Sequence, residues 1–285
     1  MPRFVYLFLT LILFSSHTLF AASVWQVTKD NQQFYLVGTV HLLSESDFPL
    51  PSAFDTAFNA STHLIFETDL AELTGPSGMN KLMSQNTYKP GQSLQQVLSK
   101  EVYEALQTVA NARQWPLTSI EQFKPAFAAM MMATLELQRL GAASTGVDMH
   151  YLQRAQQQQK TISGLETIDE HLAVMSAMNE LDADSLIKST IKDIEQTEAM
   201  LTKMKAAWRS GDSQALKQLF LDDMQQFPEM YDILLVKRNH AWLKTLEQLD
   251  EPNVMVLVGA LHMVGEDGLL TLLNRQGYQI TQLTE

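Results

Sequence analysis

The hydrophobic pattern at the start of the chain predicts a β-hairpin. Residues 24–27 and 34–40 are rich in β-branched and aromatic side chains, and polar residues separate the two runs. This arrangement predicts two antiparallel strands with a turn at 29–32. The second run ends at His41 in the sequence LVGTVHLL, so a Gly-x-x-His motif stands at the predicted carboxyl end of this strand.

The hairpin is followed by a predicted helix and another strand. Pro51 and Ser52 are typical of the first turn of a helix, and the apolar run at 63–66 predicts a short strand. Glu67 follows this strand directly in the sequence LIFETDL. The first part of the chain is therefore predicted to form a strand, a Gly-x-x-His motif, a helix, a strand and a terminal glutamate.

The carboxyl-terminal part repeats this plan. Residues 254–261 form a continuous apolar run, which is typical of a strand buried on both faces of a parallel sheet. His262 ends the run in the sequence LVGALHMV, which contains a second Gly-x-x-His motif. A helix is predicted at 266–275 and a returning strand at 278–283.

These two similar α/β halves predict an α/β fold with one mixed central sheet. A strand, a crossover helix and a second strand form a parallel unit, so we expect both halves to contribute to a single sheet. His41 and His262 then lie at the carboxyl ends of their strands, where open α/β sheets bind ligands. A large helical insert, at approximately 91–250, separates the halves and is expected to pack on the sheet.

Apolar residues at helical spacing predict the elements of this insert. The predicted elements are a helix at 94–109, a buried helix at 126–140, a helix at 147–159, a strand at 161–163, and long amphipathic helices over 168–250 with breaks near Gly211 and Pro228.

The first residues have the features of a secretory signal peptide. Arg3 precedes an apolar run at 4–14, and small residues follow at 21–23. The run is shorter than the roughly 20 residues of a membrane-spanning helix, which disfavours a retained anchor. We therefore predict that 1–22 is a signal peptide, that 23–285 is a single periplasmic or secreted domain, and that no stable membrane insertion remains.

Composition narrows the chemistry. The formal net charge is −12, and such an acidic chain does not favour binding to nucleic acid. The chain has no cysteine, which excludes a thiol nucleophile and thiolate metal ligands. A metal site must then use histidine, aspartate and glutamate, which favours ions such as Zn, Mn or Co. The sequence contains no GxSxG, HExxH or Walker-type motif.

The paired Gly-x-x-His motifs and Glu67 form the main candidate site. If the strands of the first half are neighbours, their ends bring Glu67 beside His41, and His262 completes the group. Two imidazoles and one carboxylate are adequate ligands for a divalent metal ion that keeps a position for water. The alternatives are hydrogen-bonded structural histidines and a glutamate that caps the next segment or pairs with a lysine. Asp69 is a weaker candidate.

Further polar residues stand in helical or loop contexts. They are Asp148 in GVDMHYLQRA, Glu166 in SGLET, and Arg238 and Asn239 in VKRNHAWL. Arg238 is suited to bind a substrate carboxylate or a developing oxyanion. The alternative is that Arg238 pairs with Asp148 or Glu166 and anchors the insert. His171 is predicted at an exposed helix start and is not counted as a site residue.

Six blocks of the sequence resemble those of one protein family, TraB/PrgY/GumN, whose animal relatives are the TIKI metalloproteases. The blocks are, in order, LVGTVHLL, LIFETDL, GVDMHYLQRA, SGLET, RNHAWL and LVGALHMVGEDGLLTLLNRQGY. The resemblance covers essentially the whole of 23–285. It implies a fold of two α/β halves similar to that of erythromycin esterase and ChaN-like proteins.

The resemblance also implies a divalent-metal-dependent peptidase activity, which is that of the TIKI branch. By this likeness His41, His262 and Glu67 form the active site. The other block residues would lie behind them or contact the substrate, and they are Asp148, Glu166, Arg238 and Asn239.

The leading expectation is an exported metal-dependent hydrolase that acts on peptides. His41, Glu67 and His262 would hold Mn, Co or Zn, and a metal-bound water would attack a peptide carbonyl. Glu67 or Glu166 would serve as general base if it does not bind the metal. Two alternatives remain open: a metal-free esterase-like hydrolase with His41 as base, and a non-catalytic protein that binds a peptide or haem. The expected partner is a peptide or small-molecule substrate.

Overall fold

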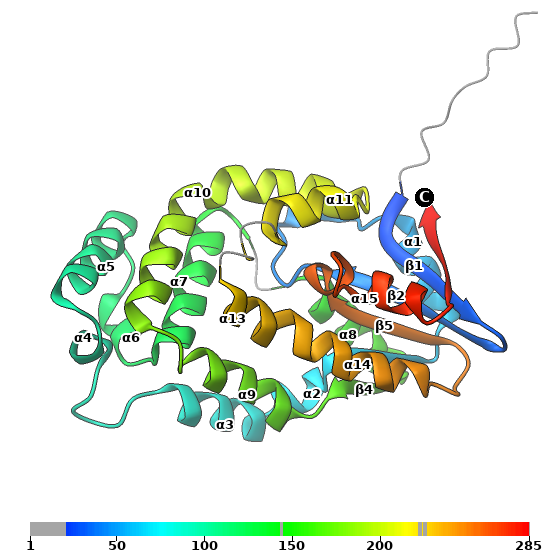
Figure 1. Cartoon of the computed structure of the whole chain (residues 1–285), viewed down its shortest axis with the longest axis horizontal. Coiled ribbons are helices and arrows are strands. Elements are labelled where there is room, and N and C mark those ends of the chain that lie inside the picture. The colour runs from blue at the N-terminus through cyan, green and yellow to red at the C-terminus, as the bar shows by residue number, and fades with distance from the viewer. Residues whose placement is uncertain (1–20, 143–144, 222–223, 225–226, 285) are drawn as a thin grey trace, which may run out of the picture.

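The structure is a computed structural model that describes residues 21–142, 145–221, 224 and 227–284 (Figure 1). Residues 1–20, which make up most of the predicted signal peptide, lie outside the described residues. In the part that is described, no helix has both the length and the apolar composition needed to cross a membrane.

The elements follow one another along the chain as strands near both ends with helices between them. The strands are β1 (Ala21–Lys29), β2 (Gln32–Thr39), β3 (His63–Thr68), β4 (Thr161–Glu166), β5 (Val254–Gly259) and β6 (Gln279–Thr284). The helices are α1 (Ser52–Ala60), α2 (Leu70–Leu73), α3 (Pro76–Asn86), α4 (Leu94–Val97), α5 (Lys100–Arg113), α6 (Leu117–Glu121), α7 (Pro125–Arg139), α8 (Val147–Gln157), α9 (Ile168–Met178), α10 (Ala183–Arg209), α11 (Ser213–Leu216), α13 (Pro228–Tyr231), α14 (Lys237–Glu247) and α15 (Leu269–Arg275).

The six strands of the described chain form one mixed sheet in the order β4-β3-β5-β2-β1-β6. β1 and β2 form the predicted antiparallel hairpin, and β6 also pairs antiparallel with β1. β2, β3 and β4 join the sheet through parallel pairing, with β5 between β2 and β3. The predicted α/β class with one mixed central sheet is therefore confirmed.

The two halves leave the middle of the sheet in opposite directions. From β2 the chain passes through α1 and over β5 to reach β3, whereas from β5 it passes through α15 and over β2 and β1 to reach β6. α14 and α15 lie in front of the sheet in Figure 1, and α1 and α8 lie behind it. Such a reversal between neighbouring parallel strands is the point at which open α/β sheets bind ligands, outside the carboxyl ends of the strands.

One expectation about strand order is wrong. The strands that precede His41 and Glu67 are not neighbours, because β5 lies between them. β5 is the continuous apolar run of the second half, and all its residues from Val254 to Val258 are fully buried. A strand that is buried on both faces is most stable in the middle of a sheet. Glu67 is therefore next to the end of β5, and His41 lies on the other side of that strand.

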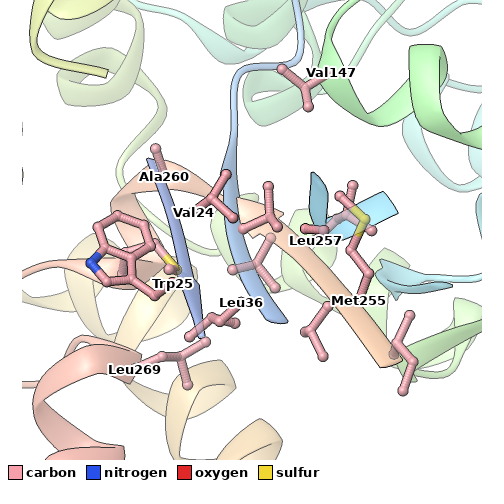
Figure 2. Close-up of a cluster of buried hydrophobic side chains, with 14 of the residues drawn as sticks. Val24, Trp25, Leu36, Val147, Met255, Leu257, Ala260 and Leu269 are labelled. Atoms are coloured by element: carbon pink, nitrogen blue, oxygen red, sulfur yellow. The ribbon is translucent and has the colours of Figure 1, made fainter. Parts of the chain in front are cut away.

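Apolar side chains of the strands and the covering helices form the main core. Figure 2 shows a part of it, with Val24 and Trp25 of β1, Leu36 of β2 and Leu257 of β5. These side chains are at most 5% exposed. Burial of this much apolar surface fixes the sheet and, with it, the positions of the strand ends.

The helical insert has a second core of its own. This core is formed by α4 to α7 and by the first half of α10, and it lies beside the sheet in Figure 1. α10 contributes Ile187 and Ile194 to the second core and Ala207 and Trp208 to the main core. Its 27 residues span about 40 Å at the rise of an α-helix. α10 therefore connects the insert to the sheet.

Three details of the insert differ from the predicted elements. The helix predicted at 94–109 is interrupted, because the Ser99 side chain accepts a hydrogen bond from the Val102 amide and begins α5. The helical region predicted over 168–250 has a further break at Asp182, whose side chain accepts a hydrogen bond from the Ser185 amide and begins α10. The helix predicted to be buried, α7, leaves Met130 38% exposed.

Trp208 is expected to be the main anchor between α10 and the sheet. It is fully buried, its Nε1 donates to the Gly38 carbonyl at 2.8 Å, and its ring packs against Phe54. Trp208→Ala should lower the free energy of unfolding by about 3–5 kcal/mol in urea denaturation. Lys203→Ala, at an exposed position of the same helix, should change it by less than about 0.5 kcal/mol. Equal effects of the two substitutions would contradict this role of Trp208.

Candidate active site

The three main predicted residues surround a single glycine at the end of β5. A Cβ atom placed on Gly259 would lie 3.7 Å from His41 Nε2, 3.7 Å from His262 Cδ2 and 3.2 Å from Glu67 Oε1. The absence of a side chain at Gly259 thus leaves the space into which the three groups project. The structure brings together one group from the end of each of three adjacent strands.

His41 is oriented by a carboxylate from the insert. Its Nδ1 lies 2.8 Å from Asp148 Oδ2, and the Thr39 hydroxyl donates to Asp148 Oδ1 at 2.8 Å. Because an ionised carboxylate only accepts hydrogen bonds, His41 Nδ1 is the donor. Nε2 is then left to face Gly259. The His41 side chain is 67% exposed, which makes it the most accessible of the three groups.

Gly146 allows this contact to form. It precedes α8, and a Cβ at this position would lie only 2.2 Å from the carbonyl carbon and oxygen of His41. The next amide, that of Val147, donates to the Val40 carbonyl at 3.0 Å. The first turn of α8 therefore packs directly on the backbone beside His41, and this close packing places Asp148 against the imidazole. The sequence block GVD thus has a steric explanation.

The charge of Asp148 raises the pKa of His41 above its ordinary value, with a further contribution from the hydrogen bond between the two side chains. Partial removal from water acts in the opposite direction, as does the positive charge of Arg238, but neither outweighs the carboxylate. At neutral pH the environment of His41 therefore favours the protonated imidazole.

His262 is buried and oriented by an amide. Its Nδ1 lies 2.7 Å from Asn239 Oδ1, while Asn239 Nδ2 donates to the carbonyls of His262 and Asp267. The two carbonyl partners identify the amide nitrogen, so Asn239 Oδ1 must be an acceptor and His262 Nδ1 carries a proton. Nε2 of the neutral ring is therefore unprotonated, and the Arg238 Nη1 donates to it at 3.2 Å.

Burial lowers the pKa of His262 to about 4, and the neighbouring Arg238 charge acts in the same direction. The charge of Glu67, whose Oε1 lies 3.8 Å from His262 Nε2, opposes the shift without cancelling it. His262 is neutral at physiological pH. The two Gly-x-x-His motifs therefore hold imidazoles with opposite protonation preferences.

Glu67 is a buried carboxylate with fixed partners. Its Oε1 accepts from the Gly259 amide at 2.8 Å, and its Oε2 accepts from Arg238 Nη2 at 2.6 Å. Burial by itself would raise the pKa of Glu67, but the charge that His262 gains in acid, together with the charges of Arg238 and His41, outweighs burial and keeps the pKa well below its ordinary range. Glu67 is therefore ionised throughout the neutral pH range.

Arg238 connects the two glutamates. Besides its bond to Glu67, its Nη2 donates to Glu166 Oε1 at 2.7 Å and its Nε donates to Glu166 Oε2 at 3.1 Å. The guanidinium lies over the ring of Trp242, whose Nε1 also donates to Glu166. Of the two pairings considered for Arg238 from the sequence, the one with Glu166 forms, and Asp148 pairs with His41 instead.

His171 belongs to this cluster, contrary to its assignment to an exposed helix start. Its side chain is 30% exposed, and its Nδ1 lies 2.7 Å from Glu166 Oε1. Thr167 and Glu170 form a capping box that begins α9 immediately after β4, so the first turn of α9 brings His171 back to the strand end. The pattern T-x-x-E after SGLE was the sequence signal for this turn. Asp69, by contrast, caps α2.

Two overlapping sets of residues have the chemistry of a metal site. The predicted set is His41, Glu67 and His262, in which each imidazole has its Nδ1 fixed by an oxygen acceptor, as metal-binding histidines do. The second set is Glu67, Glu166 and His171, whose ligand atoms all lie within 4.8 Å of one another. Among the described residues, the ligand atoms of the predicted set do not all lie this close together. Glu67 is common to both sets.

The environment of His41 leads to a pH prediction for the protein freed of metal by chelation. The pairing with Asp148 stabilises the fold below the ordinary histidine pKa of about 6.5, and this contribution is lost as the pH rises through the raised pKa. Asp148→Asn should lower the pKa of His41, measured by NMR titration of its ring protons. Glu45→Gln, which changes an exposed acid in the short 3-10 helix that follows His41 along the chain, should leave the pKa of His41 nearly unchanged. An unaltered titration in Asp148→Asn would refute the pairing.

Comparisons with known proteins agree with the six sequence blocks. The protein YbaP of Escherichia coli K12 is 26% identical to this chain, over 85% of this chain and 88% of YbaP. The metalloprotease TIKI1 is 22% identical in Xenopus tropicalis and 23% identical in Danio rerio; each alignment covers 90% of this chain but only 60% and 62% of the TIKI1 proteins. No solved structure matches the chain significantly.

The family model described as TraB/PrgY/gumN matches residues 23–282, which include both Gly-x-x-His motifs and every residue of the two candidate metal sets. This match agrees with the resemblance inferred from the sequence blocks. The chain belongs to the TraB/PrgY/gumN family.

Proposed function

We propose that this protein is a metal-dependent hydrolase that cleaves peptides. The observation that carries the proposal is the convergence of His41 Nε2, His262 and Glu67 Oε1 around Gly259, at the strand ends where α/β sheets bind ligands. The similarity to TIKI1, a protein named as a metalloprotease, supports the reaction class. The predicted signal peptide supports action in the periplasm or outside the cell.

The opposite pKa shifts of the two histidines support a division of roles. A pair of titratable groups whose environments move their pKa values apart is typical of an acid and a base that act together. His41, with its pKa raised by Asp148, is suited to donate a proton to the leaving amine. His262, neutral and with an unprotonated Nε2, is suited to bind a metal ion or to accept a proton.

Carboxylate and imidazole donors suit a divalent ion such as Zn, Mn or Co. Glu67 would hold it with Glu166 and His171, which leaves the proton of His41 for the leaving amine, or with His262 and His41, in which case His41 must first lose that proton. Asp148 and Asn239 would keep the imidazoles of His41 and His262 in the required orientation. When bound, such an ion would supply Lewis acidity and lower the pKa of a water molecule. Without the ion, the charged neighbours of Glu67 lower its pKa, which suits this carboxylate to bind a cation rather than to donate a proton.

Substitution of the converging residues tests this proposal. His262→Ala and Glu67→Gln should each lower the rate of hydrolysis of a peptide library with added Mn²⁺ or Co²⁺ by about 10²–10⁴-fold. The matched control is His63→Ala, because His63 lies at the opposite end of β3 and pairs with Glu251 and Ser163. Rates in the control should stay close to those of the wild type. Peptide binding without turnover by the wild type would exclude the enzyme.

A metal-free hydrolase is the second candidate, and one observation favours it. The Asp148–His41 pair, with an exposed imidazole whose Nε2 faces the site, is the arrangement of a histidine that activates water without a metal ion, and the raised pKa of His41 requires that it do so in its deprotonated form, the minor one at neutral pH. Chelation separates the two candidates. The metal-dependent hydrolase should lose its activity in EDTA and regain it with Mn²⁺ or Co²⁺, whereas activity that persists in EDTA would favour the Asp148–His41 pair alone.

A further inference from the structure

Arg238 lies at the centre of the residues that are candidates to bind a metal ion. Its Nη2 lies 2.6 Å from Glu67 Oε2, 2.7 Å from Glu166 Oε1 and 3.5 Å from His171 Nδ1, and its Nη1 lies 3.2 Å from His262 Nε2. The guanidinium thus contacts four of the five members of the two candidate sets, and His41 is the exception. Among these side chains it is the group that carries a permanent positive charge.

The guanidinium is fully engaged by these contacts. All three of its nitrogens donate hydrogen bonds, including a long one of 3.4 Å to the Leu234 carbonyl. Its side chain is 12% exposed, and those of Glu67 and Glu166 are 11% and 7% exposed. In this arrangement Arg238 has no donor left for a substrate. Its expected role as a substrate or oxyanion ligand therefore requires that it first leave the two glutamates.

The charges in the cluster are not balanced. Glu67 and Glu166 bring two negative charges and Arg238 brings one positive charge, while the charge of protonated His41 is balanced by its partner Asp148. A divalent cation between the same carboxylates would neutralise both, and buried charges are costly unless they are compensated. A divalent ion together with the guanidinium would instead leave an excess of positive charge in a buried place. The two cations therefore compete for the carboxylates.

We propose that Arg238 is the resident cation of this site, and that it occupies the position between Glu67 and Glu166 in the metal-free protein and leaves it when a divalent ion binds. The inference rests on the proposed function in that it takes a divalent ion as the competitor. In this exchange Arg238 controls the affinity of the site for the metal ion. The released guanidinium then has free N–H donors for a substrate carbonyl or carboxylate. In this role Arg238 is a positioning residue.

Metal binding without catalysis tests the exchange. Arg238→Gln should bind Mn²⁺ at least about ten-fold more tightly than the wild type in calorimetric titration of EDTA-treated protein, because removal of a buried positive charge removes both competition and repulsion. Arg238→Lys keeps the charge and should stay near the wild type. Arg139→Gln is the matched control, because Arg139 also binds a buried glutamate, Glu136, through two nitrogens; it should leave Mn²⁺ affinity unchanged.

A double variant tests whether the gain in Mn²⁺ affinity arises at the cluster of Glu67, Glu166 and Arg238. Adding Glu67→Gln to Arg238→Gln should abolish the gain. The exchange is refuted if Arg238→Gln binds Mn²⁺ no more tightly than the wild type, if neither protein binds it, or if the gain persists without the Glu67 carboxylate. An active, Mn²⁺-dependent wild type combined with the first or the third of these results would overturn the exchange alone, whereas a lack of Mn²⁺ binding in both proteins would overturn the exchange together with the metal-dependent function. Increased Mn²⁺ affinity of Arg238→Gln in a protein without peptidase activity would overturn the proposed function alone.

Tryptophan fluorescence gives a readout that does not depend on the folding of Arg238→Gln. The guanidinium carbon lies 4.5 Å from the centre of the Trp242 ring, so its departure changes the surroundings of that indole. Addition of Mn²⁺ to the wild type should change the emission, and Trp242→Phe should remove that change. No change in the wild type, or a change of equal size in Trp242→Phe, would mean that the surroundings of Trp242 do not change when Mn²⁺ is added, and would overturn the exchange.

Discussion

The buried carboxylate of Glu67 is the group on which the rest of the site depends. A charged side chain that is only 11% exposed must be compensated within the fold, because its transfer from water is costly. The Gly259 amide and the Arg238 guanidinium provide that compensation. The first bond ties β3 to β5 at the end of their pairing, and the second ties α14 to the sheet. The compensation of this one buried charge therefore determines how β3, β5 and α14 pack together.

The two Gly-x-x-His motifs are alike in sequence but differ in chemistry. His41 is exposed and faces a carboxylate, so its protonated form is favoured; His262 is buried and faces a guanidinium, so its neutral form is favoured. In both, Nδ1 is bound by an oxygen acceptor and Nε2 is left for the site. The repeated motif places an imidazole at a strand end twice, and the surrounding residues make the two sites unequal.

The helical insert is a part of the site as well as a second lobe. Asp148 on α8 and Arg238 and Asn239 on α14 come from it, and each contacts or orients a residue at the strand ends. Glu166, which the same stretch of chain supplies, ends β4 in the sheet itself. The anchoring of α10 by Trp208 and the close approach at Gly146 fix the insert to the strand ends. Loss of that anchoring would alter the orientation of His41 and His262 without touching either residue.

The sequence by itself determined the hairpin, the strands at both ends and the residues that stand at their carboxyl ends. These features follow from local periodicity and from Gly, Pro and polar residues at element ends, which are properties of neighbouring positions. It also placed a strand at 161–163, within β4. The breaks at Ser99 and Asp182 were not predicted. The helical spacing of apolar residues continues across both positions, so the pattern does not show that the polar side chain there caps a new helix.

Only the tertiary structure decided that β5 lies between β2 and β3, that Arg238 pairs with both glutamates, and that His171 joins them. The contacts of Arg238 with the two glutamates join residues 72 or more positions apart, and that of His171 follows from the direction in which α9 leaves β4. They depend on which surfaces must be buried together and which buried charges must be compensated. Such constraints act on the whole fold, and no local pattern of residues contains them.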